Sequence, residues 1–140
     1  MQKITILFIA LATICLCEGK HFTRCELVTE LRKQRFPEYQ LRHWVCLIEH
    51  ESGRDTKMVN SYSDGTLDCG LFQINGRDGY LHGRTKPGKD CNVTCPQLLS
   101  DDITIASNCA KRIYESRQFR FWNGWKKHCR GKGLPDIRQC

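Results

Sequence analysis

The sequence predicts an α+β fold, with helices at both ends of the chain and a small three-stranded antiparallel sheet in the middle. Apolar residues recur at helical spacing near both termini, whereas an Asp-Gly hairpin signal and short strand-like runs lie between residues 58 and 75. The 140 residues fit one domain, since domains typically contain about 100–200. A hydrophobic content of 40% argues against disorder.

The first nineteen residues have the composition of a secretory signal peptide. Lys3 precedes an apolar run over residues 4–17, and cleavage after either Gly19 or Cys17 would place small residues at the site that signal peptidase recognises. The run is shorter than the roughly 20 residues that span a bilayer, so an uncleaved membrane anchor is the weaker alternative. We therefore expect a signal peptide over residues 1–19 and one domain over residues 20–140.

Two amphipathic helices are predicted next. The first covers residues 24–35 and is ended by Pro37. Its apolar face consists of Leu27, Val28 and Leu31. The second covers residues 40–52 and is stopped by Ser52-Gly53. Its apolar face consists of Leu41, Trp44, Val45 and Ile48.

Three short strands are predicted over residues 59–62, 66–69 and 72–75. Asp64-Gly65 lies between the first two and is a strong hairpin signal. Gly70 is expected to begin the turn into the third strand.

The remaining chain is predicted to be a long loop followed by helices. Residues 76–99 are rich in Gly and Pro and have little periodicity. Ser100-Asp101-Asp102 resembles a helix cap before an apolar stripe from Ile103 to Ile113, and residues 121–128 suggest a short aromatic helix.

Cysteine use points to an oxidising compartment. Ten cysteines in 140 residues exceed what a reduced cytosolic protein normally carries, and eight remain once residues 1–19 are removed. Four disulfides are the favoured interpretation. Zinc is the weaker one, because Cys91 and Cys95 have no second close Cys or His pair at finger spacing.

Two carboxylates could carry acid–base chemistry. At about 100° per residue, Glu51 falls within the apolar arc of its helix, whereas Glu49 falls beyond it. An apolar setting should raise the pKa of Glu51 and keep it a proton donor; the alternative is that it leans into solvent at the helix end. Asp68 follows in a strand with polar neighbours, and two carboxylates in different environments suit cleavage of a glycosidic bond. Alone, Asp68 is also compatible with an ordinary strand-end aspartate.

These residues belong to a series of spaced motifs that resembles the c-type (chicken-type) lysozymes, the glycoside hydrolase family of lysozymes and lactalbumins. The resemblance runs in order through residues 20–140. The motifs are Cys25-Glu26-Leu27, Trp44-Val45-Cys46, His50-Glu51-Ser52, Ser63-Asp64-Gly65, Asp68-x-Gly70-Leu71-Phe72-Gln73-Ile74-Asn75, Cys91-x3-Cys95-x2-Leu98-Leu99, Asp102-Ile103-Thr104, Cys109-Ala110-Lys111 and Phe121-Trp122-x2-Trp125-x3-Cys129.

The resemblance implies a helical lobe, a small three-stranded lobe and a saccharide cleft between them. It implies that Glu51 is the general acid and Asp68 the nucleophile, with substrate contacts from Gln73, Asn75 and Trp122. It also implies four disulfides, namely Cys25–Cys140, Cys46–Cys129, Cys69–Cys95 and Cys91–Cys109. No cofactor and no structural metal are expected, because the positions matching the family's calcium site retain a lone carboxylate, Asp102.

The chain departs from the family pattern at the cleft. Cys69 follows Asp68 where Tyr is usual, and Tyr80 stands where the loop Cys belongs. Because side chains alternate along a strand, Cys69 should point away from Asp68 and still reach Cys95. Asp78-Gly79 replaces the aromatic residues that contact sugar in the family, and Tyr62 replaces a small amide.

The expected function is that of a secreted, monomeric muramidase that cleaves bacterial peptidoglycan in antibacterial defence or digestion. A net charge of +7 would attract the protein to anionic bacterial surfaces. The alternative from the same fold is a weak or inactive saccharide-binding protein. Disruption of membranes by charge is a third interpretation, and nucleic acid binding would rest on charge alone. Asn92-Val93-Thr94 is a glycosylation sequon for which we expect low occupancy, because it lies between two cysteines predicted to be bridged.

Overall fold

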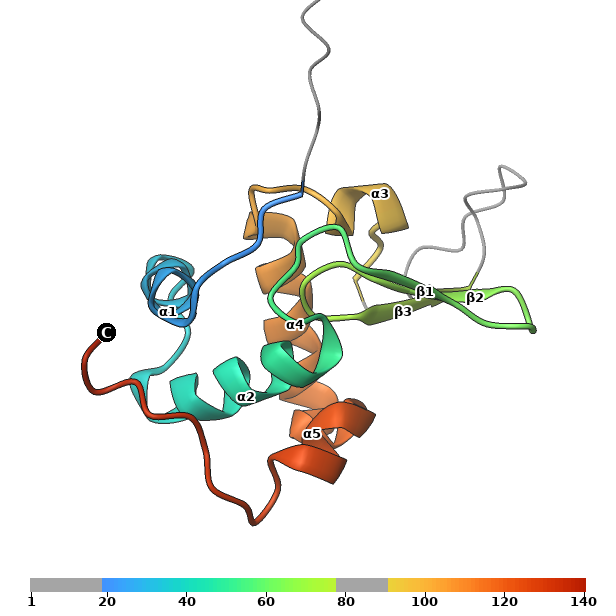
Figure 1. Cartoon of the computed structure of the whole chain (residues 1–140). Helices are drawn as coiled ribbons and strands as arrows, with labels where there is room; N and C mark the ends of the chain where they lie inside the picture. The colour runs from blue at the N-terminus through green and yellow to red at the C-terminus, as the bar shows by residue number, and fades with distance from the viewer. Residues whose placement is uncertain (1–18, 78–90) are drawn as a thin grey trace, which may run out of the picture.

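The computed structural model describes residues 19–77 and 91–140. Nearly all of the expected signal peptide lies outside these residues, as do Asp78, Gly79 and Tyr80. The described chain forms helices grouped on one side of a small sheet, with α2 in the middle of the helical part (Figure 1). This confirms the predicted α+β fold.

The first two helices follow the apolar pattern closely. Helix α1 covers Arg24–Lys33 and begins at Thr23, whose side chain and backbone exchange hydrogen bonds with Glu26 in a capping box. A single turn of 3-10 helix, η1 (Glu38–Gln40), leads into α2 (Leu41–Glu51). The predicted apolar faces of α1 and α2 are both fully buried.

The sheet has three antiparallel strands in the order β1-β2-β3, with bounds Val59–Ser61, Thr66–Cys69 and Ile74–Arg77. Gly65 adopts a positive φ of 80° in the predicted hairpin. Asp68 is paired with Asn60 on β1 and Asn75 on β3. These three polar residues therefore lie side by side across the sheet.

The third strand begins two residues later than the sequence predicts. Residues 70–73 form a tight turn in which Gly70 and Gln73 have φ values of 73° and 47°. A Cβ atom at Gly70 would clash with the carbonyl oxygen of Leu98, so this turn also needs glycine for close packing. Phe72 and Gln73 consequently lie in the turn, and Ile74 opens the strand.

The C-terminal half contains two further departures from the prediction. A short helix, α3 (Cys95–Leu98), lies in what was expected to be loop, and it begins at a capping box between Thr94 and Gln97. The long helix α4 covers Thr104–Arg117, as expected. The predicted aromatic helix is divided into η2 (Gln118–Phe121) and α5 (Asn123–His128), because Trp122 between them is extended.

Four disulfides join the segments, and they are Cys25–Cys140, Cys46–Cys129, Cys69–Cys95 and Cys91–Cys109. These are the pairings that the resemblance implies. Cys69 is buried and its disulfide attaches β2 to α3, whereas the adjacent Asp68 is only partly buried on the cleft side. No helix of the described residues is long and apolar enough to cross a membrane.

The core is built around Trp44 of α2, which is fully buried. Its ring contacts five aromatic side chains with centroid distances of 4.8–5.9 Å, namely Phe36, Phe72, Tyr114, Phe119 and Trp122. Phe72 comes from the turn before β3, and Trp122 lies directly before α5. The core therefore fixes α2, the turn and α5 relative to one another.

Candidate active site

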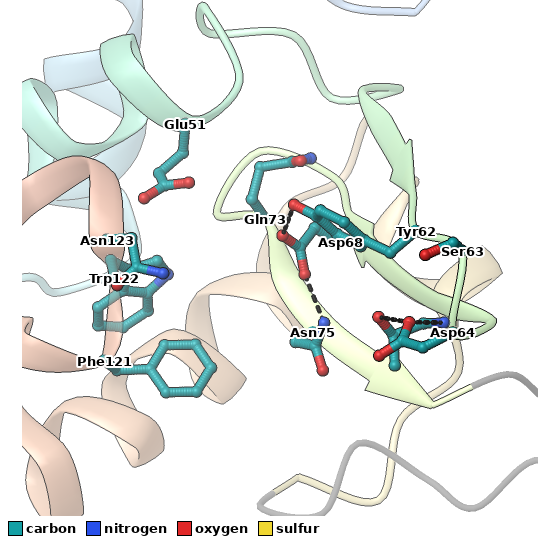
Figure 2. A pocket seen from close by; sticks show the side chains of 11 residues that line it. Glu51, Tyr62, Ser63, Asp64, Asp68, Gln73, Asn75, Phe121, Trp122 and Asn123 are labelled. Carbon is teal, nitrogen blue, oxygen red and sulfur yellow. Dashed lines mark hydrogen bonds between the residues drawn. The ribbon is translucent and has the colours of Figure 1, made fainter.

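A cleft of about 570 Å³ lies between the end of α2, the start of α5 and the sheet. Figure 2 shows Glu51, Phe121, Trp122 and Asn123 on one side of it, and Tyr62, Asp68 and Asn75 on the other. The eleven lining residues are Glu51, Tyr62, Ser63, Asp64, Thr66, Asp68, Gln73, Asn75, Phe121, Trp122 and Asn123. All five predicted catalytic and substrate-binding residues are among them.

Two buried hydrogen bonds attach both helices to the turn before β3. The hydroxyl of Ser52, directly after α2, donates to the carbonyl oxygen of Leu71 at 2.7 Å. The indole N–H of Trp122, directly before α5, donates to the carbonyl oxygen of Phe72 at 2.7 Å. The turn thus holds Glu51 and Trp122 at fixed positions beside the sheet.

Glu51 is the last residue of α2 and is partly buried, so its side chain does not simply extend into solvent. Its Oε1 accepts a 2.7 Å hydrogen bond from the backbone N–H of Gly124. Burial raises the pKa of Glu51; the Gly124 hydrogen bond opposes this effect and the negative charge of Asp68 adds to it. The group is therefore biased towards the protonated form that a general acid requires.

Asp68 lies in a polar environment on the opposite side. The amide of Asn75 donates to its Oδ1 at 2.7 Å, and the hydroxyl of Tyr62 donates to its Oδ2 at 2.7 Å. Asn60 pairs with Asp68 in the sheet, but its side-chain amide donates to Gln73 instead. Both carboxylate oxygens of Asp68 thus accept a hydrogen bond from a neighbouring side chain.

Gln73 lines the cleft with a side chain that is already hydrogen-bonded to the protein. Its amide N–H groups donate to the carbonyl oxygens of Met58 and Gly70, both at 2.9 Å, and its Oε1 accepts from Asn60. The residue is 3% exposed. Its visible contribution is to fix the turn and β1 beneath the cleft, and a contact with substrate stays a prediction.

Three features of the site were not predicted from the sequence. These are the hydrogen bond from Gly124 to Glu51, the hydrogen bond from Tyr62 to Asp68, and the position of Phe121 in the wall of the cleft. For Gly124 a signal existed: a glycine within a predicted helix often marks a close approach. The resemblance places Tyr62 at the cleft but does not predict its hydrogen bond, and nothing in the sequence indicates the position of Phe121, because both contacts are set by tertiary packing.

The arrangement places one half-buried carboxyl and one solvated, hydrogen-bonded carboxylate across a polar cleft. Such a pair can protonate a leaving oxygen from one side and stabilise or attack an oxocarbenium-like carbon from the other. Among the described residues, no group of three or more His, Cys, Asp or Glu side chains is arranged to hold a metal ion. The placement of the two carboxyl groups suits acid-assisted cleavage of a glycosidic bond.

Comparison with known proteins shows which family this sequence is similar to. The model of the C-type lysozyme/alpha-lactalbumin family matches residues 20–140. A lysozyme of Bombyx mori is 55% identical over 141 aligned positions, and one of Hyalophora cecropia is 52% identical over 141; both alignments cover all of this chain and all of the relative. A lysozyme of Antheraea mylitta is 57% identical over 122 positions, covering 86% of this chain and all of the relative.

Proposed function

The chain belongs to the C-type lysozyme/alpha-lactalbumin family and is a lysozyme-type glycoside hydrolase, and on that premise we propose that it is a secreted muramidase. Its substrate is the β-1,4 bond between N-acetylmuramic acid and N-acetylglucosamine in bacterial peptidoglycan. Its role is antibacterial defence or digestion.

The observation that carries this proposal is the different environment of the two carboxyl groups. Burial raises the pKa of Glu51, so this residue donates a proton to the leaving glycosidic oxygen. Asp68, held by Tyr62 and Asn75, attacks the anomeric carbon and forms a glycosyl ester. Glu51, now ionised, takes a proton from the water that hydrolyses this ester, and the product retains its configuration.

Charge supports the choice of a bacterial wall as substrate. The chain carries 22 Lys and Arg against 15 Asp and Glu, which gives a net charge of +7. Bacterial walls are anionic, so a cationic protein is attracted to them and concentrates at the surface. The protein acts there as a monomer.

Secretion is supported by the position of the family match. The match begins at residue 20, directly after the expected cleavage point at Gly19. The four disulfides also suit an oxidising compartment outside the cytosol. Purification from the medium of secreting cells, followed by N-terminal sequencing, tests cleavage near this residue.

Clearing of a bacterial wall suspension tests the proposed activity. We expect the wild type to clear it, and we expect Glu51→Gln and Asp68→Asn to lose most or all of that activity. Glu115→Gln is the matched control, because Glu115 is exposed on α4 and outside the cleft. Clearing that persists in both cleft variants would show that charge, and not hydrolysis, carries the effect.

A saccharide-binding protein with weak or no catalysis is the second candidate. The departure from the family pattern at Asp78-Gly79 favours it, because the resemblance implies aromatic sugar-binding residues at these positions. Calorimetry with chitotriose separates the two candidates: binding without any hydrolysis of longer chitin oligomers or walls would support the second.

A further inference from the structure

Tyr62 is hydrogen-bonded directly to Asp68, the nucleophile in the proposed function, and the resemblance does not predict this hydrogen bond. Its hydroxyl donates to Oδ2 of Asp68 at 2.7 Å, while the residue as a whole remains 50% exposed. Figure 2 shows the ring lying along the sheet with its hydroxyl at the Asp68 carboxylate. We propose that Tyr62 is a positioning residue that orients the Asp68 carboxylate for attack, an inference that rests on the proposed function.

The backbone holds Tyr62 in place for this role. Its N–H donates to the carbonyl oxygen of Thr66, and its carbonyl oxygen accepts from the N–H of Gly65, both at 3.0 Å. Asp64 accepts from the backbone N–H and the hydroxyl of Thr66, which stabilises the same hairpin. The tyrosine therefore approaches Asp68 from a fixed turn.

Strand register places the Tyr62 side chain on the same face as Asp68. Asn60 is the cross-strand partner of Asp68, and Tyr62 follows Asn60 two positions later in the sequence. Side chains two apart project to the same face of a strand, and diagonal neighbours are within reach of a long aromatic side chain. The phenol reaches the carboxylate without displacing Asn75 from the other oxygen.

The phenol remains a donor at every pH at which the enzyme would work. Its hydrogen bond to Asp68, with smaller effects of burial and of the charges of Asp68 and Glu51, raises the pKa of Tyr62 to about 12. A phenolate would repel Asp68 and break the hydrogen bond, so the contact requires that the pKa of Tyr62 lie above the working pH. The hydroxyl and the Asn75 amide together restrict rotation of the Asp68 carboxylate.

Asp68 can accept this bond and still act as the nucleophile, because each carboxylate oxygen has two lone-pair sites. When the glycosyl ester forms, one oxygen becomes the ester oxygen and the other a carbonyl oxygen, and the negative charge that both donors stabilised is lost. When water cleaves the ester, the charge returns to Asp68. A donor already in place stabilises that returning charge. Tyr62 therefore assists hydrolysis of the glycosyl ester in addition to orienting the Asp68 carboxylate.

Tyr62→Phe tests this, because it removes the hydroxyl and retains the ring. We expect kcat on soluble chitin oligomers to fall about tenfold, the lower end for a hydrogen bond to a charged group, with KM changed less than twofold. Tyr39→Phe, which removes a hydroxyl from a tyrosine outside the cleft that is 82% exposed, should leave both constants unchanged. In an Asp68→Asn background, Tyr62→Phe should cause no further fall.

A titration independent of activity tests the hydrogen bond itself. At pH 11 a phenol with a pKa of about 12 is roughly one tenth ionised, whereas an ordinary phenol is mostly ionised. In carbon-13 spectra of the tyrosine rings, the Tyr62 signal should show this low ionisation in the wild type, disappear in Tyr62→Phe and be more ionised in Asp68→Asn. Burial also raises the pKa of Tyr114, whose signal should titrate alike in all three proteins.

The outcomes separate the two proposals. If the wild type is active and Tyr62→Phe leaves kcat unchanged, or changes KM alone, the positioning role is overturned and the proposed function is not. A Tyr62 phenol that ionises equally in wild type and Asp68→Asn also overturns it. A protein that hydrolyses neither walls nor oligomers overturns the proposed function, and the positioning role with it.

Discussion

The backbone N–H of Gly124 donates a 2.7 Å hydrogen bond to Oε1 of Glu51 and thereby joins the first turn of α5 to the last residue of α2. The two residues are so close that a Cβ atom at position 124 would lie 2.5 Å from Oε1 and 2.9 Å from Cδ. Gly124 is thus required here by space. Its φ is not positive, so the backbone conformation itself does not require glycine.

Gly124→Ala should therefore displace the Glu51 side chain. We expect kcat/KM for wall hydrolysis to fall at least tenfold, since a general acid typically contributes 10²–10⁴-fold and works only in reach of the leaving oxygen. Gly133→Ala is the control, because a Cβ there meets no atom within 4 Å. Equal activity of the two variants would show that Glu51 tolerates the methyl group.

Much of the helical framework followed from the sequence because its signals are local. The apolar spacing of α1 and α2 and the Asp-Gly hairpin predicted elements within about two residues of their observed bounds. The third strand begins two residues later than predicted, because Gln73 takes a left-handed conformation and its side chain is held by hydrogen bonds with Met58, Gly70 and Asn60. Such long-range support leaves no periodic pattern in the sequence.

The candidate site likewise has features that local sequence patterns predict and features that depend on tertiary contacts. The face of α2 predicted a half-buried Glu51, because helical geometry alone decides which side chains share an arc. The extended conformation of Trp122, which divides η2 from α5, was missed because it is held by a tertiary hydrogen bond to Phe72. The short helix α3 was missed although Thr94 and Gln97 have the spacing of a capping box, because four residues are too few for periodicity.

The charge of Asp68 should be measurable in the titration of Glu51. Asp68 raises the pKa of Glu51, so Asp68→Asn should lower that pKa, whereas burial should keep it raised above its ordinary value. Carbon-13 titration of the Glu51 carboxyl in both proteins measures the difference. In the wild type, activity should fall as pH rises through the Glu51 pKa, since only the protonated form is a general acid. An unchanged titration in Asp68→Asn would mean that the two carboxyl groups do not interact.

Glu51 should also reduce stability at neutral pH. Its pKa is raised in the folded protein, so below its ordinary pKa both folded and unfolded states are protonated and no penalty exists. As pH rises, the unfolded state ionises first, and the folded state loses relative stability. Glu51→Gln can still accept from Gly124 and removes this penalty. Its Tm gain over wild type should be near zero at pH 3 and positive at pH 7; a gain that is equal at both would contradict the assigned cause.

The Cys69–Cys95 disulfide holds β2 against α3, next to Asp68. Its two cysteines are 26 positions apart, so removing both with Cys69→Ser and Cys95→Ser should lower the free energy of unfolding by about 3 kcal/mol. Activity below the melting range should also fall, because β2 carries Asp68. The matched control removes Cys25–Cys140, which attaches the C-terminus to α1, and should reduce stability while sparing kcat. A peptide map of the unreduced wild type that joins Cys69 to another cysteine would contradict the pairing.

Phe121 places an aromatic ring in the wall of the cleft. Its ring lines the wall, contacts the Trp122 ring edge-on at a centroid distance of 4.9 Å, and lies under the Arg117 guanidinium at 5.6 Å. Aromatic faces give large contact area at small entropic cost. Phe121→Ala should raise KM for chitin oligomers several-fold with little change in kcat. Phe121→Tyr, which keeps the aromatic face, serves as control. If Phe121→Ala lowers kcat and leaves KM unchanged, Phe121 acts by holding Trp122 in position and not by binding sugar.

Asp78 and Gly79 lie outside the described residues, yet the family resemblance gives them a testable effect. Replacing aromatic residues at a sugar platform with an acid and a glycine removes binding that the ground and transition states share, so KM should be high and kcat near normal. Asp78 should also repel carboxylates of the peptide stems, an effect that added salt screens. Installing Trp at both positions should therefore tighten chitotriose binding while single-turnover cleavage stays nearly constant. If calorimetry shows that the double Trp variant binds chitotriose no more tightly than the wild type, whereas Phe121→Ala binds it more weakly, then Phe121 of η2 supplies the aromatic sugar contact in this protein.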